Sequence, residues 1–407
     1  LPPPERVPTK NGYLPRVPAF PSSSPPAPSR IAVVHDWLDT WRGGENVLAE
    51  VLSLFPEADL FALVNFLPDA SRRHLLGKRA HATYLQRIPG ARCHFRKLLP
   101  LFPHAIGTLD LSDYPLVISI SHAVAKGVRT TARQLHLCYC LTPMRYAWDL
   151  RPAYLESIDA RTGWRRSLAE ALLDRLQRWD LATSRSVSEF IAISDHIRDR
   201  IGRCYGRESA VIYPPVDVDF FTPPKPDRAT GALYVTASRW VPYKRIDLIV
   251  EAFRALPDRQ LRVAGDGPDA RRIRAAAGPN IEFVGELDRT ALRELLRNAR
   301  AFLFAADEDF GILPVEAQAC GTPVIAFGRG GTLETVRGPG QAGPTGVFFE
   351  TQSAAAITDA VKRFEAGPPI PASACRSQAE RFSAARFRAT FETHIQGAWE
   401  SFVTGGG

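Results

Sequence analysis

Short apolar runs alternate with segments of helical spacing along most of the chain. In the first half the apolar runs lie at residues 31–34, 58–64, 116–121, 134–140 and 189–194. Apolar runs of this length are typical of strands buried on both faces of a parallel sheet. Strands that alternate with helices predict an α/β fold built on such a sheet.

The same pattern starts again after a proline-rich stretch, residues 211–226, that has no helical period. We therefore predict two Rossmann-like, doubly wound domains of similar size that face a central cleft. Ligands of such sheets bind beyond the carboxyl ends of the strands, so functional residues are expected on the strand-to-helix loops. The apolar runs of the second half lie at residues 232–238, 260–267, 281–285, 300–306 and 323–328.

These patterns divide the chain into five parts. The first part contains ten prolines and is predicted to be an extended leader outside the fold. The proline-rich stretch is expected to link the two domains. The last helical segments are expected to pack back on the N-terminal domain. The predicted parts are residues 1–29, 30–210, 211–226, 227–375 and 376–407.

The composition narrows the class of partner. The 407 residues carry a formal net charge of +8, which favours anionic partners: nucleotides, phosphates, nucleic acid or acidic lipid headgroups. Six cysteines without a CxxC pair or a zinc-like spacing predict reduced, structural thiols in the cytosol. The sequence has no apolar run of about 18 residues, so no membrane-spanning helix is expected. We predict no metal site and no cofactor.

A basic cluster follows the first strand of the second domain, in "TASRWVPYKRID". Arg239 comes after the strand, and Lys244 and Arg245 are predicted to open the next helix. Basic side chains oppose the dipole of a helix N-terminus, so an anion is expected to neutralise them. The fork of Arg239 and the point charge of Lys244 suit a diphosphate, and a solvated charged face is the alternative.

Two glycine-containing loops are candidates for close contact with a ligand. Gly43 and Gly44 precede a helix whose free N–H groups can receive a phosphate, although a plain tight turn also fits. Gly265 lies in "VAGDGPDA", which has only half of a dinucleotide fingerprint and therefore favours a tight turn beside a base or ribose. Further on, in "FVGEL", the backbone of Val284 is predicted to meet a base edge.

The stretch "EDFGILPVE" places two glutamates, Glu308 and Glu316, around a predicted helix start. The backbone amides between them are expected to ring an anion at that helix N-terminus. Carboxylates accept hydrogen bonds, so Glu308 is predicted to hold sugar hydroxyls and Glu316 ribose hydroxyls. The alternative is that Glu316 caps the helix and Glu308 is solvated. The amides belong to Phe310, Gly311, Ile312 and Leu313.

Taken together, these segments resemble the retaining family 4 glycosyltransferases of the two-domain GT-B fold, over residues 31–400. The stretches "EDFGILPVE" and "RWVPYKRID" carry the resemblance. "VISISHAVAKGV" and "LTPMRYAWDLR" resemble the mannosyltransferases that build exopolysaccharide units and O-antigens on lipid carriers. The resemblance implies transfer of a sugar, with GDP-mannose as the suggested donor, to a polyprenyl-diphosphate-linked acceptor.

The resemblance also implies roles for single residues. His122 matches the family histidine near the donor sugar, and Gly44 approaches the phosphates from the N-terminal domain. Glu308 holds the transferred sugar, while Arg239 and Lys244 hold the diphosphate. The implied reaction retains configuration without metal or enzyme nucleophile, by front-face attack in which the departing phosphate oxygen takes the proton.

Acceptor contacts are expected from the N-terminal domain. Relatives commonly have a histidine where this chain has Leu141, which puts any acceptor-selecting role of that histidine in doubt. The acceptor residues that we predict are Trp37, Arg145 and Tyr146.

Residues 84–106 interleave basic and large apolar side chains, as in a segment that lies on an anionic leaflet. The predicted location is therefore the inner face of the cytoplasmic membrane, and an ordinary amphipathic core segment is the alternative. A UDP-sugar transferase and a sugar-nucleotide epimerase are rival enzymes. A phosphorylase is disfavoured because Lys362 is the only lysine beyond Lys244. A nucleic-acid binder is disfavoured because the basic residues are dispersed and the glutamates would repel phosphates.

Overall fold

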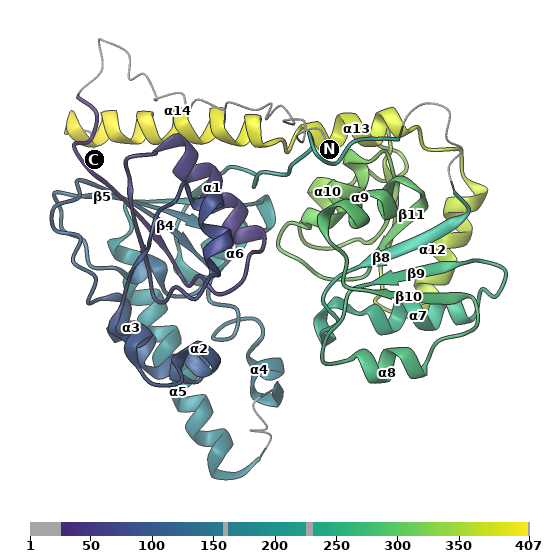
Figure 1. Cartoon of the computed structure of the whole chain (residues 1–407), viewed down its shortest axis with the longest axis horizontal. Helices are drawn as coiled ribbons and strands as arrows, with labels where there is room; N and C mark the ends of the chain where they lie inside the picture. The colour runs from purple at the N-terminus through teal and green to yellow at the C-terminus, as the bar shows by residue number, and fades with distance from the viewer. Residues whose placement is uncertain (1–25, 158–161, 225–230, 406–407) are drawn as a thin grey trace, which may run out of the picture.

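The computed structural model describes residues 26–157, 162–224 and 231–405. These residues form two α/β domains, and two segments of the chain connect one domain to the other (Figure 1). The N-terminal domain has a parallel sheet of order β3-β2-β1-β4-β5-β6-β7. Its strands are β1 Ile31–His35, β2 Asp59–Ala62, β3 His81–Ala82, β4 Leu116–Ser121, β5 Leu135–Cys140, β6 Glu189–Ala192 and β7 Ser209–Val211.

The C-terminal domain has a second parallel sheet, of order β10-β9-β8-β11-β12-β13. Two doubly wound α/β domains are what the apolar pattern predicts, and the fold class is confirmed. The strands are β8 Leu233–Ala237, β9 Leu261–Ala264, β10 Ile281–Gly285, β11 Ala299–Phe304, β12 Val324–Phe327 and β13 Gly346–Phe349.

Helices follow the strands in both domains. Those of the N-terminal domain are α1 Gly43–Leu54, α2 Ala91–His94, α3 Phe102–Ile106, α4 Arg151–Ser157, α5 Gly163–Thr183 and α6 Asp195–Tyr205. Those that follow are α7 Ile246–Arg254, α8 Ala270–Ala275, α9 Arg289–Arg297, α10 Ile312–Ala319, α11 Thr332–Thr335, α12 Ala354–Ala366, α13 Ala372–Glu380 and α14 Ala384–Val403.

The central strands β4 and β5 lack alternation of polar and apolar residues because they are buried on both faces. Every residue of β4 and of β5 is buried, because helices cover both faces of the sheet. Two polar side chains of these strands pair with each other inside the core: Ser119 Oγ lies 2.8 Å from His136 Nε2. Burial lowers the pKa of His136 to about 3, which keeps this imidazole neutral.

The chain passes twice between the domains, and its last helix returns to the first domain. Figure 1 shows α14 running along the N-terminal domain. The rings of Phe387 and Phe391 pack edge-on against Tyr139 of β5, and Arg388 bonds Glu50 of α1 at 2.5 Å. The two connecting segments lie side by side, because Val216 N–H donates to the Phe382 carbonyl.

The segment 84–106 differs from the surface-lying segment that we predict. It folds into short turns, α2, α3 and the 3₁₀ helices Tyr84–Arg87 and Phe95–Leu101. Phe95, Leu99 and Phe102 are buried in the N-terminal core, so these large side chains are not available to a lipid leaflet. No helix among the described residues is both long and apolar enough to cross a bilayer.

The predicted leader lies almost wholly outside the described residues. Of residues 26–29, which are described, Pro26 offers its carbonyl to Trp399 Nε1 of α14 at 2.9 Å.

Candidate active site

A cavity of about 1030 Å³ lies between the two domains, at the carboxyl ends of the central strands of both sheets. Most of the predicted site residues line it, although they come from segments spread over 270 positions of the chain. From the N-terminal domain these are Gly43, Gly44, His122 and Arg145. From the C-terminal domain they are Arg239, Lys244, Gly265, Glu308, Phe310, Gly311, Ile312 and Leu313.

Four predicted residues are not among those that line the cavity. Trp37 packs edge-on against His122, which lines the cavity, with the two ring centroids 4.5 Å apart. Tyr146 and Val284 are half-buried, and each packs against a hydrophobic core cluster. Glu316 lies in the second turn of α10, half-buried, and burial raises the pKa of its carboxyl to about 8. Their assigned roles stay predictions.

The His122 loop is organised by Asp36, a residue that the sequence analysis did not single out. Asp36 follows β1 and is fully buried, and its carboxylate accepts hydrogen bonds from four successive backbone N–H groups, at 2.5–3.0 Å. The same carboxylate lies 2.8 Å from His122 Nδ1. The donors are the N–H groups of His122, Ala123, Val124 and Ala125.

These contacts set the charges of both side chains. Burial alone would raise the pKa of Asp36, but the adjacent His122 and the N–H donors lower it to about 2. Burial also opposes charging of His122, and Asp36 outweighs it, so the His122 pKa lies above its ordinary value. With Nδ1–H turned to Asp36, Nε2 is the ring nitrogen of His122 left to face the cleft, as a donor when the ring is protonated and as an acceptor when it is neutral.

On the opposite wall Lys244 forms an ion pair with Glu308. Burial, followed by repulsion from Arg145, lowers the pKa of the Lys244 ammonium to about 8, so at pH 7 it remains mostly protonated. The pair therefore presents one side chain that can only accept hydrogen bonds and one that can only donate them to the cavity.

The prediction that Lys244 and Arg245 open a helix is wrong in its geometry. Lys244 ends a single 3₁₀ turn, Pro242–Lys244, and Arg245 adopts a left-handed conformation with φ of 52° before α7 begins at Ile246. The break turns Lys244 to the cavity, where it lies near Arg239.

The N-terminus of α10 forms the floor of the cavity. Gly311 precedes the helix with φ of 88°, a conformation that disfavours any side chain. The Phe310 side chain turns away and packs between Tyr213 and Phe382, whose ring centroids lie 5.9 and 5.4 Å from its own. The backbone amides of this turn are thereby left to face an anion.

Gly330 and Gly331, in "GRGG", pack directly against the backbone of residues 308–310. A Cβ on Gly331 would lie 2.3 Å from the Phe310 Cα, and Gly331 N–H donates to the Glu308 carbonyl at 2.8 Å. Gly265 has a comparable role at the end of β9, because a Cβ there would lie 1.8 Å from the Ser238 carbonyl oxygen. This glycine therefore allows two backbone segments of the cavity wall to meet.

Asp309 ties the two domains together and was also missed. Its carboxylate binds Arg200 of α6 at 2.6 Å and Arg145 at 3.5 Å, and its carbonyl accepts from Ser194 Oγ at 2.6 Å. The sequence signal was present, since Asp309 is the one charge between the two glutamates. Its partners lie more than 100 residues away, so the pairing is not readable from local spacing.

The cavity thus combines backbone amides at a helix N-terminus with cationic side chains, a carboxylate and an imidazole. Cations and helix-end amides lie on the C-terminal side, while the glycines that precede α1 approach from the N-terminal side. A Cβ on Gly43 would come within 2.6 Å of Ile312 across the cleft. Such a site is suited to an anionic molecule that also carries hydroxyl groups.

Solved structures with this architecture define the fold. Sucrose-phosphate synthase of Thermosynechococcus elongatus is similar over 91% of this chain and 99% of its own, with a TM-score of 0.68 and 20% identity. Anabaena HepE, solved in complex with UDP-glucose, is similar over 90% of this chain and 99% of its own, with a TM-score of 0.62 and 17% identity. The protein has the GT-B fold.

Sequence comparison points the same way for the C-terminal domain. Residues 219–382 match the family of glycosyl transferases group 1. Over 172 residues, 35% of this chain and 45% of the relative, the chain is 32% identical to the GDP-mannose-dependent monoacylated alpha-(1-6)-phosphatidylinositol monomannoside mannosyltransferase of Corynebacterium glutamicum. The chain spans less than half the length of the curated relatives that it matches.

Proposed function

We propose that this protein is a retaining glycosyltransferase that moves a sugar, mannose from GDP-mannose, to a lipid-diphosphate-linked saccharide. One observation carries the proposal: Arg239, Lys244, Glu308 and the amides of residues 310–313 converge on a single interdomain cavity. A nucleotide-diphosphate sugar has the matching chemistry, two phosphates beside a ring of hydroxyls.

In the proposed reaction the C-terminal wall stabilises the departing nucleoside diphosphate. Arg239, Lys244 and the α10 N-terminus face the charge that develops on the phosphate oxygen. Glu308 orients the sugar through its hydroxyls. The acceptor hydroxyl attacks from the face that the nucleotide leaves, and its proton passes to the phosphate oxygen, so the protein supplies position and charge.

His122 faces the sugar from the N-terminal wall. Asp36 accepts from its Nδ1–H, so Nε2 is the ring nitrogen left for a hydroxyl of the transferred sugar: it donates to that hydroxyl as imidazolium and accepts from it as neutral imidazole. The cations named above neutralise the diphosphate without a metal ion. An unchanged transfer rate after treatment with EDTA is the expected result, and a rate restored only by a divalent cation would contradict metal independence.

The donor is tested by thermal shift with GDP-mannose, UDP-glucose and a dTDP-sugar. A ligand at 100 times its Kd stabilises the native state by about 2.7 kcal/mol, enough for a rise of several degrees. We expect GDP-mannose to give the largest rise and Lys244→Ala to abolish it. A rise with UDP-glucose alone would favour the second candidate, a UDP-sugar transferase, and the absence of any rise would contradict the nucleotide-sugar site.

The acceptor proposal places the N-terminal domain against the inner face of the cytoplasmic membrane. Because the large apolar side chains of segment 84–106 are mostly buried, the contact would be electrostatic, through exposed Arg92 and Lys97. Charge reversal of both residues should abolish flotation with anionic liposomes. Arg271→Glu, an exposed reversal on α8 of the other domain, is the control and should leave flotation unchanged.

A further inference from the structure

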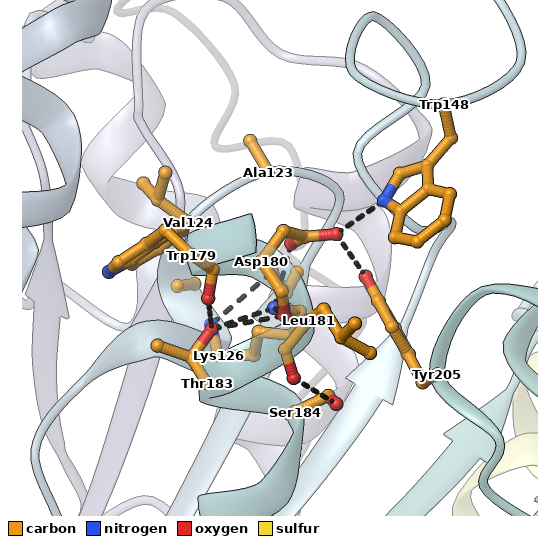
Figure 2. A network of polar contacts seen from close by, with 12 residues as sticks. Ala123, Val124, Lys126, Trp148, Trp179, Asp180, Leu181, Thr183, Ser184 and Tyr205 are labelled. Atoms are coloured by element: carbon orange, nitrogen blue, oxygen red, sulfur yellow. Dashed lines mark hydrogen bonds and ion pairs between the residues drawn. The ribbon is translucent and has the colours of Figure 1, made fainter. Parts of the chain in front are cut away.

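A buried ion pair in the N-terminal domain lies outside the cavity and has no part in the chemistry described above. Lys126 is 2% exposed and Asp180, near the end of α5, is fully buried. Figure 2 shows how their side chains meet, with the Lys126 ammonium directed into the end of α5. Burial of two charges is costly unless the pair is well satisfied, so the arrangement calls for a physical reason.

The Lys126 ammonium donates two hydrogen bonds and forms one ion pair, all to residues of α5. It lies 2.7 Å from Asp180 Oδ1, donates to the Asp180 carbonyl at 2.7 Å, and donates to Thr183 Oγ1 at 3.0 Å. All three oxygen atoms belong to Asp180 and Thr183 in the C-terminal turn of α5, where the helix dipole also favours a cation. The pair is therefore a firm attachment rather than a chance contact.

The second carboxylate oxygen of Asp180 holds two further elements. It accepts from Trp148 Nε1 and from Tyr205 Oη, both at 2.8 Å (Figure 2). One carboxylate thus joins three segments that are distant in sequence: the loop of Lys126, the loop of Trp148 and the end of α6.

Two of the three segments supply residues that line the cavity, and the third binds one such residue. The Lys126 loop begins at His122, and the Trp148 loop carries Arg145. The helix that ends at Tyr205 carries Arg200, which binds Asp309 across the cleft at 2.6 Å. The Asp180 carboxylate is the point at which these segments are held in register behind the cavity wall.

The packing behind this point leaves little room for adjustment. A Cβ on Gly127 would lie 2.3 Å from the Trp179 ring, so the Lys126 loop lies directly against α5. Asp36 fixes the first half of the same loop through its backbone N–H groups, and Asp180 fixes the second half through Lys126. The loop is held at both ends.

We propose that Asp180 is a positioning residue for the cleft, which acts through Lys126, Trp148 and Tyr205 to set His122, Arg145 and Arg200. It contacts no ligand itself. Side chains that act on a substrate must be held to within a fraction of an ångström by supporting contacts, which is the part that this network supplies. The kinetic part of the proposal rests on the proposed function, while the structural part does not.

The test uses two double variants of the full chain. Lys126→Met with Asp180→Leu removes all three connections and both charges. Lys126→Met with Asp180→Asn keeps an oxygen that accepts from Trp148 and Tyr205. Removing both charges avoids an unpaired buried ion, so both doubles should melt well above the single variants Lys126→Met and Asp180→Leu.

Backbone amide hydrogen exchange measures how firmly the three segments are held, and it needs no ligand. We expect the Leu double variant to exchange faster, by at least fivefold, in residues 122–128, 144–150 and 200–206. The Asn double variant should exchange faster only in residues 122–128. Wild-type exchange in all three segments of the Leu double variant would overturn the proposal, because the network would then contribute only bulk stability.

Kinetics with GDP-mannose and UDP-glucose supply the second readout. In the Leu double variant we expect kcat to fall at least tenfold while the donor KM stays within threefold, because the donor-binding cations lie on the other domain. Faster exchange with an unchanged kcat would overturn the role in positioning. If the wild type turns over neither donor, the proposed function fails, and hydrogen exchange alone decides whether Asp180 holds the three segments.

Discussion

Replacement of Asp36 by asparagine tests how much the His122 loop depends on one carboxylate. The change keeps the size of the side chain but removes its charge. Asparagine has one accepting oxygen, and its NH₂ group would face two of the four backbone N–H donors or the His122 ring. At least two donors would therefore lose their acceptor inside the core.

The magnitude follows from the pKa of Asp36. A fall from the ordinary 3.8 to about 2 corresponds to about 2–3 kcal/mol of stabilisation at neutral pH. The unpaired N–H groups add a cost of about 1–3 kcal/mol. We therefore expect Asp36→Asn to lower the free energy of unfolding by about 3–5 kcal/mol at pH 7.

The pH dependence has a definite sign. Because the pKa is lowered in the folded state, the stabilisation is complete above the unfolded value near 4 and is lost as pH falls through 2. At pH 3 about half of the ionic part should remain. Wild type and variant should therefore differ less at pH 3 than at pH 7.

Urea unfolding, followed by circular dichroism at both pH values, measures the difference. Asp113→Asn is the matched control, because Asp113 is an exposed partner of Arg30, and it should change the unfolding free energy by less than about 0.5 kcal/mol. A shift of that small size for Asp36→Asn as well, or a gap that widens in acid, would refute the reasoning about the loop.

Three further outcomes follow from the cavity. Lys244→Ala and Glu308→Ala should each lower kcat/KM for sugar transfer by about 10²-fold or more with circular dichroism unchanged, and wild-type rates in both would sink the assignment. The affinity for GDP should fall as pH rises through about 8, the pKa of the Lys244 ammonium, because only the charged form attracts phosphate. Calorimetry from pH 7 to 9 measures this affinity, and an affinity that does not change with pH would count against the role of Lys244. Gly265→Ala, with φ of 109° and a carbonyl 1.8 Å from the new Cβ, should destabilise by more than about 2 kcal/mol, whereas Gly397→Ala, in open space on α14, should be neutral or stabilising in the same melting assay.

The fold was readable from the sequence because each central strand is buried on both faces. That environment imposes uninterrupted apolar runs, as in β4 and β5, and such runs stand out against helical spacing. The convergence of loops on a cleft followed from topology alone, since parallel strands place their carboxyl ends on one edge. Most of the predicted site residues accordingly line one cavity.

The residues that escaped prediction act through partners that are distant in sequence. Asp36 reads as a polar residue after a strand, and only the fold brings the loop at 122–125, some 86 positions away, onto its carboxylate. Asp180 reads as one charge on a polar helix. The burial of Phe95, Leu99 and Phe102 was likewise decided by tertiary packing, because an amphipathic pattern does not say whether the apolar side meets lipid or protein.

The return of α14 to the first domain has a consequence for biosynthesis. A ribosome makes residues 30–210 first, yet Tyr139 stays uncovered until Phe387 and Phe391 have been translated. At a translation rate of about 5–20 residues per second, α14 is completed on the order of ten seconds or more after the N-terminal domain. During that interval the back of its sheet is open to chaperones, and maturation of the first-made half is tied to the last-made helix.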